Sequence, residues 1–104
     1  MIEKIYTYSL DKNKKTIEKI IFDENVNINH MILLQNDFLP VHFSNSNVYM
    51  IIINGTMSIN LNLEGERKYT VGEIINIPNN IKMDVRNSDS EVLEFFVVKA
   101  PAPK

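Results

Sequence analysis

The sequence lacks cysteine altogether. This absence excludes disulfide bonds, thiolate metal sites and cysteine nucleophiles. It also lacks an excess of positive charge, because 11 Lys and Arg residues stand against 13 Asp and Glu residues. Proteins that bind nucleic acids usually carry a basic stripe, so we expect no nucleic-acid partner. The one basic cluster, at residues 12–15, is interpreted as a solvated turn between strands.

Long hydrophobic runs are missing as well. The apolar stretch at residues 48–53 is among the longest, and it is far too short to cross a bilayer. The first residues contain no apolar segment of the length that a secretory signal needs. We therefore expect a cytoplasmic protein without a membrane partner. The motifs G-x-S-x-G and H-E-x-x-H and the phosphate-binding glycine loops are also absent, so none of these catalytic centres is expected.

The residues that are present predict one small all-β domain. The chain has 104 residues, of which 44% are hydrophobic, and we expect a single domain over residues 1–104. Turn signals recur at short intervals: Asn54-Gly55, which favours a type I′ hairpin, Glu64-Gly65, and the polar stretches at 78–80 and 87–90. Evenly spaced turns with short segments between them are typical of a β-sandwich or barrel.

The segments between these turns alternate between apolar and polar residues, as half-buried strands do. This alternation predicts at least seven strands, no helix longer than two turns, and a core that contains Met57, Ile59, Leu61, Met83 and Val85. Residues 26–34 form another apolar row, which includes His30. We expect N-terminal strands within residues 1–25. The last strand should end at the tail that begins at residue 100, because proline has no amide hydrogen to donate.

Two segments, residues 48–53 and 93–98, are apolar on both faces. Such a strand needs cover on both sides, and a small barrel covers only one of them with its own core. The second cover would come from a second layer of the same chain or from a partner subunit. We therefore expect a homodimer whose interface lies near Tyr49, Ile51 and Ile53, together with a strand at residues 2–10.

The spacing of one glycine, one proline and one asparagine resembles the second motif of the cupin superfamily, G-x5-P-x-G-x2-H-x3-N. Gly72, Pro78 and Asn87 occupy their places in this motif. Asn80 stands at its second glycine, and Met83 stands where its metal-binding histidine is expected.

The first cupin motif, G-x5-H-x-H-x3,4-E-x6-G, is similar to the segment that runs from His42, at its first histidine, to Gly55, at its last glycine. Ser44 stands at its second histidine and Val48 at its glutamate. The resemblance covers about residues 26–101. It implies a single-domain double-stranded β-helix, or jelly-roll barrel, which agrees with the strand pattern.

The resemblance also implies a metal site. Cupins are similar in using three histidines and a glutamate to hold Fe, Mn, Ni or Zn, and the matching positions here are His42, Ser44, Val48 and Met83. Only His42 is a good donor for these ions. We therefore expect neither a bound metal nor another cofactor. In a reserve hypothesis, His30 and His42 form a metal site that a carboxylate such as Glu94 completes.

Three hypotheses about function stay open. The first is a metal-free small-molecule-binding or regulatory domain, in which a small apolar ligand enters the barrel interior. The second is a structural homodimer with a filled barrel. The third is an enzyme that acts on a small metabolite through His42, with or without a metal, although the sequence identifies no catalytic set. We rank binding first and catalysis last. The residues that we expect to line the barrel interior are His42, Ser44, Met50, Met83 and His30.

Overall fold

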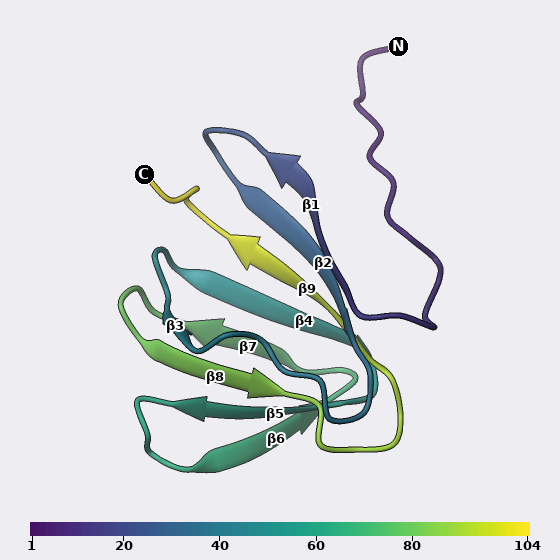
Figure 1. Ribbon diagram of the computed structural model, residues 1–104. Helices are drawn as coiled ribbons and strands as arrows, with labels where there is room; N and C mark the ends of the chain where they lie inside the picture. The colour runs from purple at the N-terminus through teal and green to yellow at the C-terminus, as the bar shows by residue number, and fades with distance from the viewer.

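The protein consists of nine strands and contains no helix, and the computed structural model describes residues 1–104. The strands are β1 (Thr16–Phe22), β2 (Asn27–Leu33), β3 (His42–Phe43), β4 (Val48–Asn54), β5 (Thr56–Leu61), β6 (Glu66–Thr70), β7 (Ile74–Ile77), β8 (Lys82–Arg86) and β9 (Leu93–Lys99). They form a five-stranded sheet of order β1-β2-β9-β4-β7 and a four-stranded sheet of order β3-β8-β5-β6 (Figure 1). The predicted all-β fold is confirmed. No helix is long and apolar enough to span a membrane.

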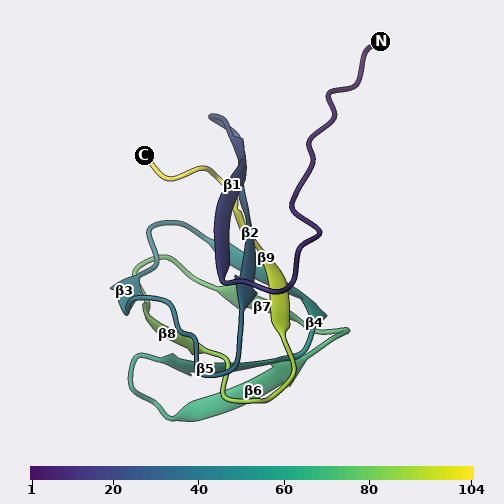
Figure 2. The ribbon, with the colours of Figure 1, turned by 45° about the vertical axis from the view of Figure 1, so that its right-hand side comes forward.

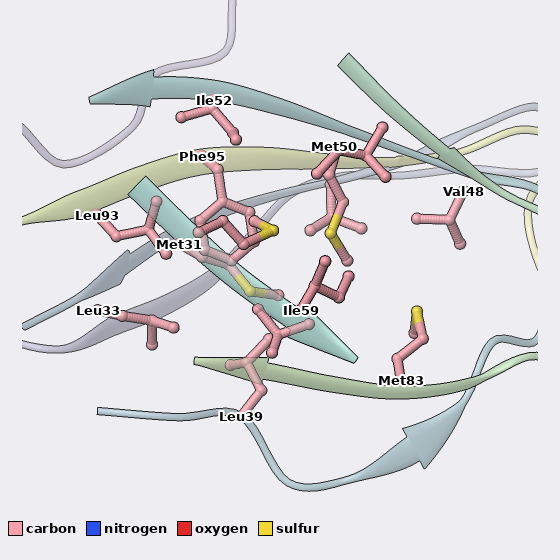
Figure 3. Packing of buried hydrophobic residues seen from close by; sticks show 14 of the residues in the cluster. Met31, Leu33, Leu39, Val48, Met50, Ile52, Ile59, Met83, Leu93 and Phe95 are labelled. Atoms are coloured by element: carbon pink, nitrogen blue, oxygen red, sulfur yellow. The ribbon is translucent and has the colours of Figure 1, made fainter. Parts of the chain in front are cut away.

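The core lies between the two sheets, as Figure 3 shows. Met57, Ile59, Met83 and Val85 of the four-stranded sheet are at most 3% exposed, and Leu61 packs against the same cluster. These are the residues that the alternation placed inside, so the prediction of the core is confirmed for this sheet. The five-stranded sheet contributes Met31, Leu33, Val48, Met50, Ile52, Ile75, Ile77, Leu93, Phe95 and Val97.

The Asn54-Gly55 turn joins β4 of one sheet to β5 of the other, so the hairpin predicted there is wrong. Gly55 has φ +80°, and a Cβ at this position would lie 2.3 Å from the backbone oxygen of Val92. Glycine is therefore needed at a corner between sheets, where the chain also passes close to another backbone segment. The Glu64-Gly65 hairpin is confirmed, because β5 and β6 pair directly.

Both faces of β2 are buried, and the row that points into the core is the opposite of the expected one. Met31 and Leu33 belong to the core, whereas His30 and Ile32 are fully buried outside it. We call this second side, which faces away from the four-stranded sheet, the outer face of the five-stranded sheet. Strand alternation reports which residues share a face, but it cannot tell which face is inner when both are covered.

The N-terminal arm, defined as residues 1–8, forms no strand and makes no hydrogen bond with the rest of the chain. Only β1 precedes residue 25, so the strand predicted at residues 2–10 is not formed within a single chain. Figures 1 and 2 show the arm leading away from both sheets. The chain rejoins the body at Ser9, whose N–H donates to Oε1 of Glu18 over 2.8 Å.

Candidate functional site

One end of the core opens into a cavity of about 40 Å³, which we call the barrel mouth. This space is small, with room for a few water molecules at most. Figure 3 shows Val48, Met50 and Met83 gathered at this end of the core. The full lining is Met31, Leu39, Val48, Met50, Met83 and Val97, together with the polar side chains of Asn29, His42 and Lys99.

His42 is the one imidazole at the barrel mouth. It lies on β3 directly opposite Met83 of β8, and it is exposed to solvent. Its Nδ1 lies 2.8 Å from the carbonyl oxygen of Pro40. Because a carbonyl oxygen only accepts, Nδ1 carries the hydrogen and donates it. In the neutral ring, Nε2 is then left as an acceptor for a ligand.

Ser44 fastens one side of the barrel to the turn after β7. Its hydroxyl donates to the carbonyl oxygen of Pro78 over 2.7 Å and accepts the N–H of Ile81 over 2.8 Å. Its backbone bonds to Ile81 and Asn80 of the same turn. The side chain is only 4% exposed and does not line the cavity. Ser44 therefore stabilises the wall of the barrel and does not line the mouth. Of the other predicted residues, Met50, Met83 and His42 do line the mouth.

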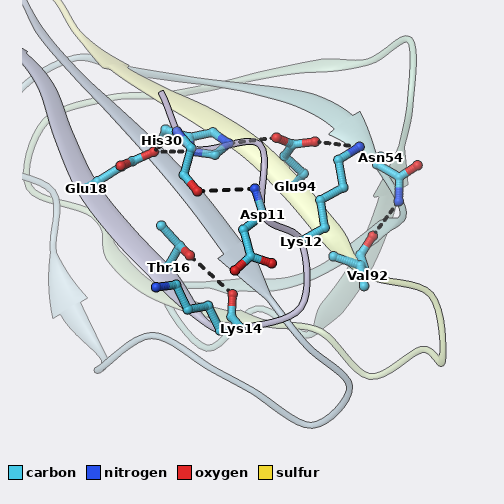
Figure 4. Close-up of polar contacts among 10 residues, drawn as sticks. Asp11, Lys12, Lys14, Thr16, Glu18, His30, Asn54, Val92 and Glu94 are labelled. Carbon is cyan, nitrogen blue, oxygen red and sulfur yellow. Dashed lines mark hydrogen bonds and ion pairs between the residues drawn. The ribbon is translucent and has the colours of Figure 1, made fainter. Parts of the chain in front are cut away.

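His30, the fifth predicted residue, lies away from the mouth in a buried polar cluster on the outer face. Its Nδ1 is 2.6 Å from Oε1 of Glu18, and its Nε2 is 2.7 Å from Oε2 of Glu94 (Figure 4). The second oxygen of Glu94 pairs with Nζ of Lys12 at 3.2 Å. Tyr8 stacks on the imidazole, with ring centroids 4.8 Å apart. The segment before β1 thus closes over a cluster that joins four parts of the chain.

The cluster favours ionised carboxylates. The N–H of Ser9 lowers the pKa of Glu18 most strongly, burial opposes it, and His30 lowers it further. Burial raises the pKa of Glu94, but the hydrogen bonds and charges of His30 and Lys12 outweigh burial, so the pKa is lowered. Every member of the cluster has a polar partner, which is what buried polar groups require. We therefore assign it a role in fastening the segment of residues 9–12 to the sheet.

No family model matches the chain. An uncharacterized protein of Methanocaldococcus jannaschii is 45% identical over 104 residues, which are all of this chain and 90% of that protein. A crystal structure of an RmlC-like cupin family protein from M. jannaschii, with a double-stranded β-helix fold, superimposes on this chain with a TM-score of 0.96. It is 45% identical, and the match covers 99% of this chain and 94% of the other. This chain belongs to the cupin family.

Two more distant structures share the fold of this chain. A protein from Thermus thermophilus is 20% identical with a TM-score of 0.77, and the match covers 92% of this chain and 91% of that one. The Cnp3 cupin domain of Schizosaccharomyces pombe is 15% identical with a TM-score of 0.76, over 91% of this chain and 73% of that one. These two likenesses show the shared fold alone.

The residues of this cupin do not fit the metal that its family implies. At the four ligand positions, Nδ1 of His42 and the hydroxyl of Ser44 are bonded to backbone groups, Val48 has no donor atom, and Met83 is a buried thioether. A divalent first-row ion needs about three or four matched donors. No group of three His, Asp or Glu side chains is placed to hold an ion elsewhere. The reserve hypothesis is wrong, because Glu94 reaches His30 while His42 lies at the mouth.

A groove adjoins the barrel mouth, and the sequence pattern did not reveal it. It has a volume of about 360 Å³. It shares Asn29 and Lys99 with the mouth, and Lys19 contributes a second ammonium group. Burial, and then the charge of Lys19, lowers the pKa of Lys99. The full lining is Lys19, Phe22, Asn27, Asn29, Asn45, Lys99, Pro103 and Lys104.

Proposed function

We propose that this cupin is a metal-free binding module that takes a small, mostly apolar molecule at the barrel mouth. One observation carries the proposal: three methionines, Met31, Met50 and Met83, line a cavity beside the acceptor nitrogen of His42. Methionine side chains are unbranched and flexible, so they repack around ligands of different shape. Apolar walls with a few placed polar groups are typical of small-molecule sites.

The size of the cavity sets the mode of binding. At about 40 Å³ the cavity is small, so we expect a ligand larger than a few water molecules to enter when the methionine side chains rotate. His42 has no carboxylate partner at the mouth, and the one hydrogen bond of its ring is to the backbone carbonyl of Pro40. Binding therefore ranks above catalysis for this site.

The methionines themselves provide the test. The chain has five: Met31, Met50 and Met83 line the mouth, Met57 is fully buried elsewhere in the core, and Met1 is exposed. Protein labelled with ¹³C in the methionine methyl groups is titrated with 1-butanol and followed by NMR. We expect saturable shifts at the three mouth methionines and none at Met57. Equal shifts at Met57, or none at any methionine, would contradict the proposal.

We also propose that the module is a homodimer. Tyr49 and Ile53 are 38% and 44% exposed on the outer face of β4, and the neighbouring Ile74 of β7 is 63% exposed. The N-terminal arm carries exposed Ile2 and Ile5 and has no hydrogen-bond partner of its own. Two unpartnered apolar surfaces on one chain suit an interface with a second copy. In a two-fold dimer, each contact between such surfaces forms twice, once from each subunit to the other.

Light scattering at micromolar concentration tests the dimer. We expect the mass of two chains for the unaltered protein. Ile53→Glu should give a single chain, because it places a charge within the apolar face. Leu63→Glu is the matched control, since Leu63 is 74% exposed on the opposite sheet's β5–β6 turn. A single-chain mass for the unaltered protein would refute the proposal.

A further inference from the structure

The groove beside the barrel mouth is built from paired lysines and asparagines. Lys19 of β1 lies opposite Asn29 of β2, and Asn27 of β2 lies opposite Lys99 of β9. All four side chains line the same groove, so cations and amides from three adjacent strands meet there. Asn27 is only 7% exposed, and its side chain makes no hydrogen bond within the protein. The amide atoms of Asn27 are accessible from the groove, so they are free to bind a ligand or a water molecule.

The lysines of this groove have no acidic side chain as a partner. No Asp or Glu lines it, and none of its three lysines takes part in an ion pair. Lys19 rests on the Phe22 ring, with Nζ 5.2 Å from the ring centroid, and this contact holds the ammonium without neutralising it. Lys99 is the most enclosed of the three, and it faces the like charge of Lys19. An anion between these two groups would offset the energetic cost of burying the Lys99 ammonium group. It would also reduce the repulsion between the two ammonium groups.

The groove and the barrel mouth are adjacent, because Asn29 and Lys99 line both. We infer that Lys19, Lys99 and Asn27 bind the oxyanion group of the same small molecule whose apolar part enters the barrel mouth. This inference rests on the proposed function and names the class of ligand: a short apolar chain or ring that ends in a carboxylate or a phosphate. Asn29, at the junction, donates its amide hydrogens to the same group.

The test compares probes that share one apolar part and differ in charge. Butyrate, propyl phosphate and the neutral butyramide, which all carry a propyl group, are titrated at low ionic strength, with backbone amides and methionine methyl groups followed by NMR. At least one anionic probe should bind about tenfold or more tightly than butyramide, as expected for hydrogen bonds to charged groups. Added salt should reduce this advantage, because the groove is open to solvent. The ratio between the two anions identifies which oxyanion the groove prefers.

Matched variants assign the effect to the groove. Lys19→Met keeps most of the side-chain length, lies outside the lining of the mouth, and should reduce the advantage of the anionic probes, with butyramide unchanged. Lys14→Met removes one positive charge outside the groove and should bind all probes as the unaltered protein does. Amide spectra of both variants confirm that each is folded.

The two possible failures differ from each other. If butyramide shifts the mouth methionines and the anions bind no better, the inference is overturned while the proposed function stands. If acetate binds as well as butyrate and no mouth methionine responds, both the shared ligand and the proposed function are overturned.

Discussion

Nε2 of His30 lies 2.7 Å from Oε2 of Glu94, a residue 64 positions further along the chain. Nδ1 of the same ring faces Glu18 at 2.6 Å. The ring thus lies between two carboxylates that come from two other strands. The cluster joins β1, β2 and β9 across the outer face, and Lys12 links the segment before β1 to it. Its contribution to stability is therefore expected to depend on pH.

The first prediction is a loss of stability in acid that Glu94 helps to cause. Its pKa is lower in the folded protein than in the unfolded chain, where it is about 4.3. A lowered pKa stabilises the fold fully above the unfolded value, and this stabilisation is lost as the pH falls through the folded value. We expect the free energy of unfolding, measured in urea, to fall steadily below about pH 5.

Glu94→Gln separates this effect from general acid unfolding. The variant should be less stable at pH 7, because His30 and Lys12 lose their ionic partner, and it should lose less stability on acidification. Glu64→Gln, in the exposed turn after β5, should keep the pH slope of the unaltered protein. Parallel slopes for Glu94→Gln and the unaltered protein would contradict the assignment.

The second prediction contrasts two buried serines. Ser44→Ala leaves the N–H of Ile81 and the carbonyl of Pro78 without their side-chain partner, so it should destabilise the fold by about 1–3 kcal/mol. Ser58 is 2% exposed and its hydroxyl has no partner, so Ser58→Ala should change stability by no more than about 0.5 kcal/mol or increase it. Urea unfolding measures both. Equal losses for the two variants would show that Ser44 does not fasten the turn.

The third prediction concerns two glycines with positive φ. Gly65→Ala should destabilise the fold by about 1–2 kcal/mol, because alanine is strained at φ +116°. No further loss is expected, since a Cβ at this position meets nothing within 4 Å. Gly55→Ala should destabilise considerably more, because its Cβ would also collide with the backbone of Val92. Thermal and urea unfolding of both variants provide the comparison. A Gly55 variant as stable as the Gly65 variant would mean that the corner adjusts freely.

The fourth prediction is that tag-free protein carries no stoichiometric first-row transition metal. The reason is the donor set at His42, Ser44, Val48 and Met83, which offers one good ligand where about three or four are needed. Elemental analysis after dialysis measures the content. One equivalent of metal that is lost on His42→Ala would refute this prediction and place catalysis ahead of binding.

The alternation of apolar and polar residues predicted most of the fold. It identified inward-facing residues correctly in strands that have one solvent-exposed face. It identified the inward residues of β5 and β8, since polar neighbours mark their outer sides. It could not orient β2, because the segment of residues 8–12 buries the outer side as well. The Asn54-Gly55 signal located a chain reversal but not its type. Whether such a turn closes a hairpin or changes sheets depends on Val92, which is distant in the sequence.

Only part of the candidate site could be predicted from the sequence, because the orientation of β2 was not known. Motif spacing brought His42 and Met83 to the mouth, and alternation brought Met50 there. The groove was missed, because Asn27 and Asn29 read as solvent-facing until the orientation of β2 was known. Its two principal lysines lie 80 positions apart by residue number, Lys19 and Lys99, and no local pattern connects them. Polar residues near the end of a strand that share a face with core residues are the signal that could have revealed it.

The bonds of Ser44 have an evolutionary consequence. To regain the metal set of other cupins, a lineage with this sequence would need changes at Ser44, Val48 and Met83 together. The first change alone breaks two buried hydrogen bonds and gains no ligand in return, since the other two positions still have none. The buried Val48 and Met83 likewise resist a charged or polar replacement singly. Each single step is therefore expected to lower stability without creating a metal site, so gradual substitution toward that donor set is unfavourable at every step.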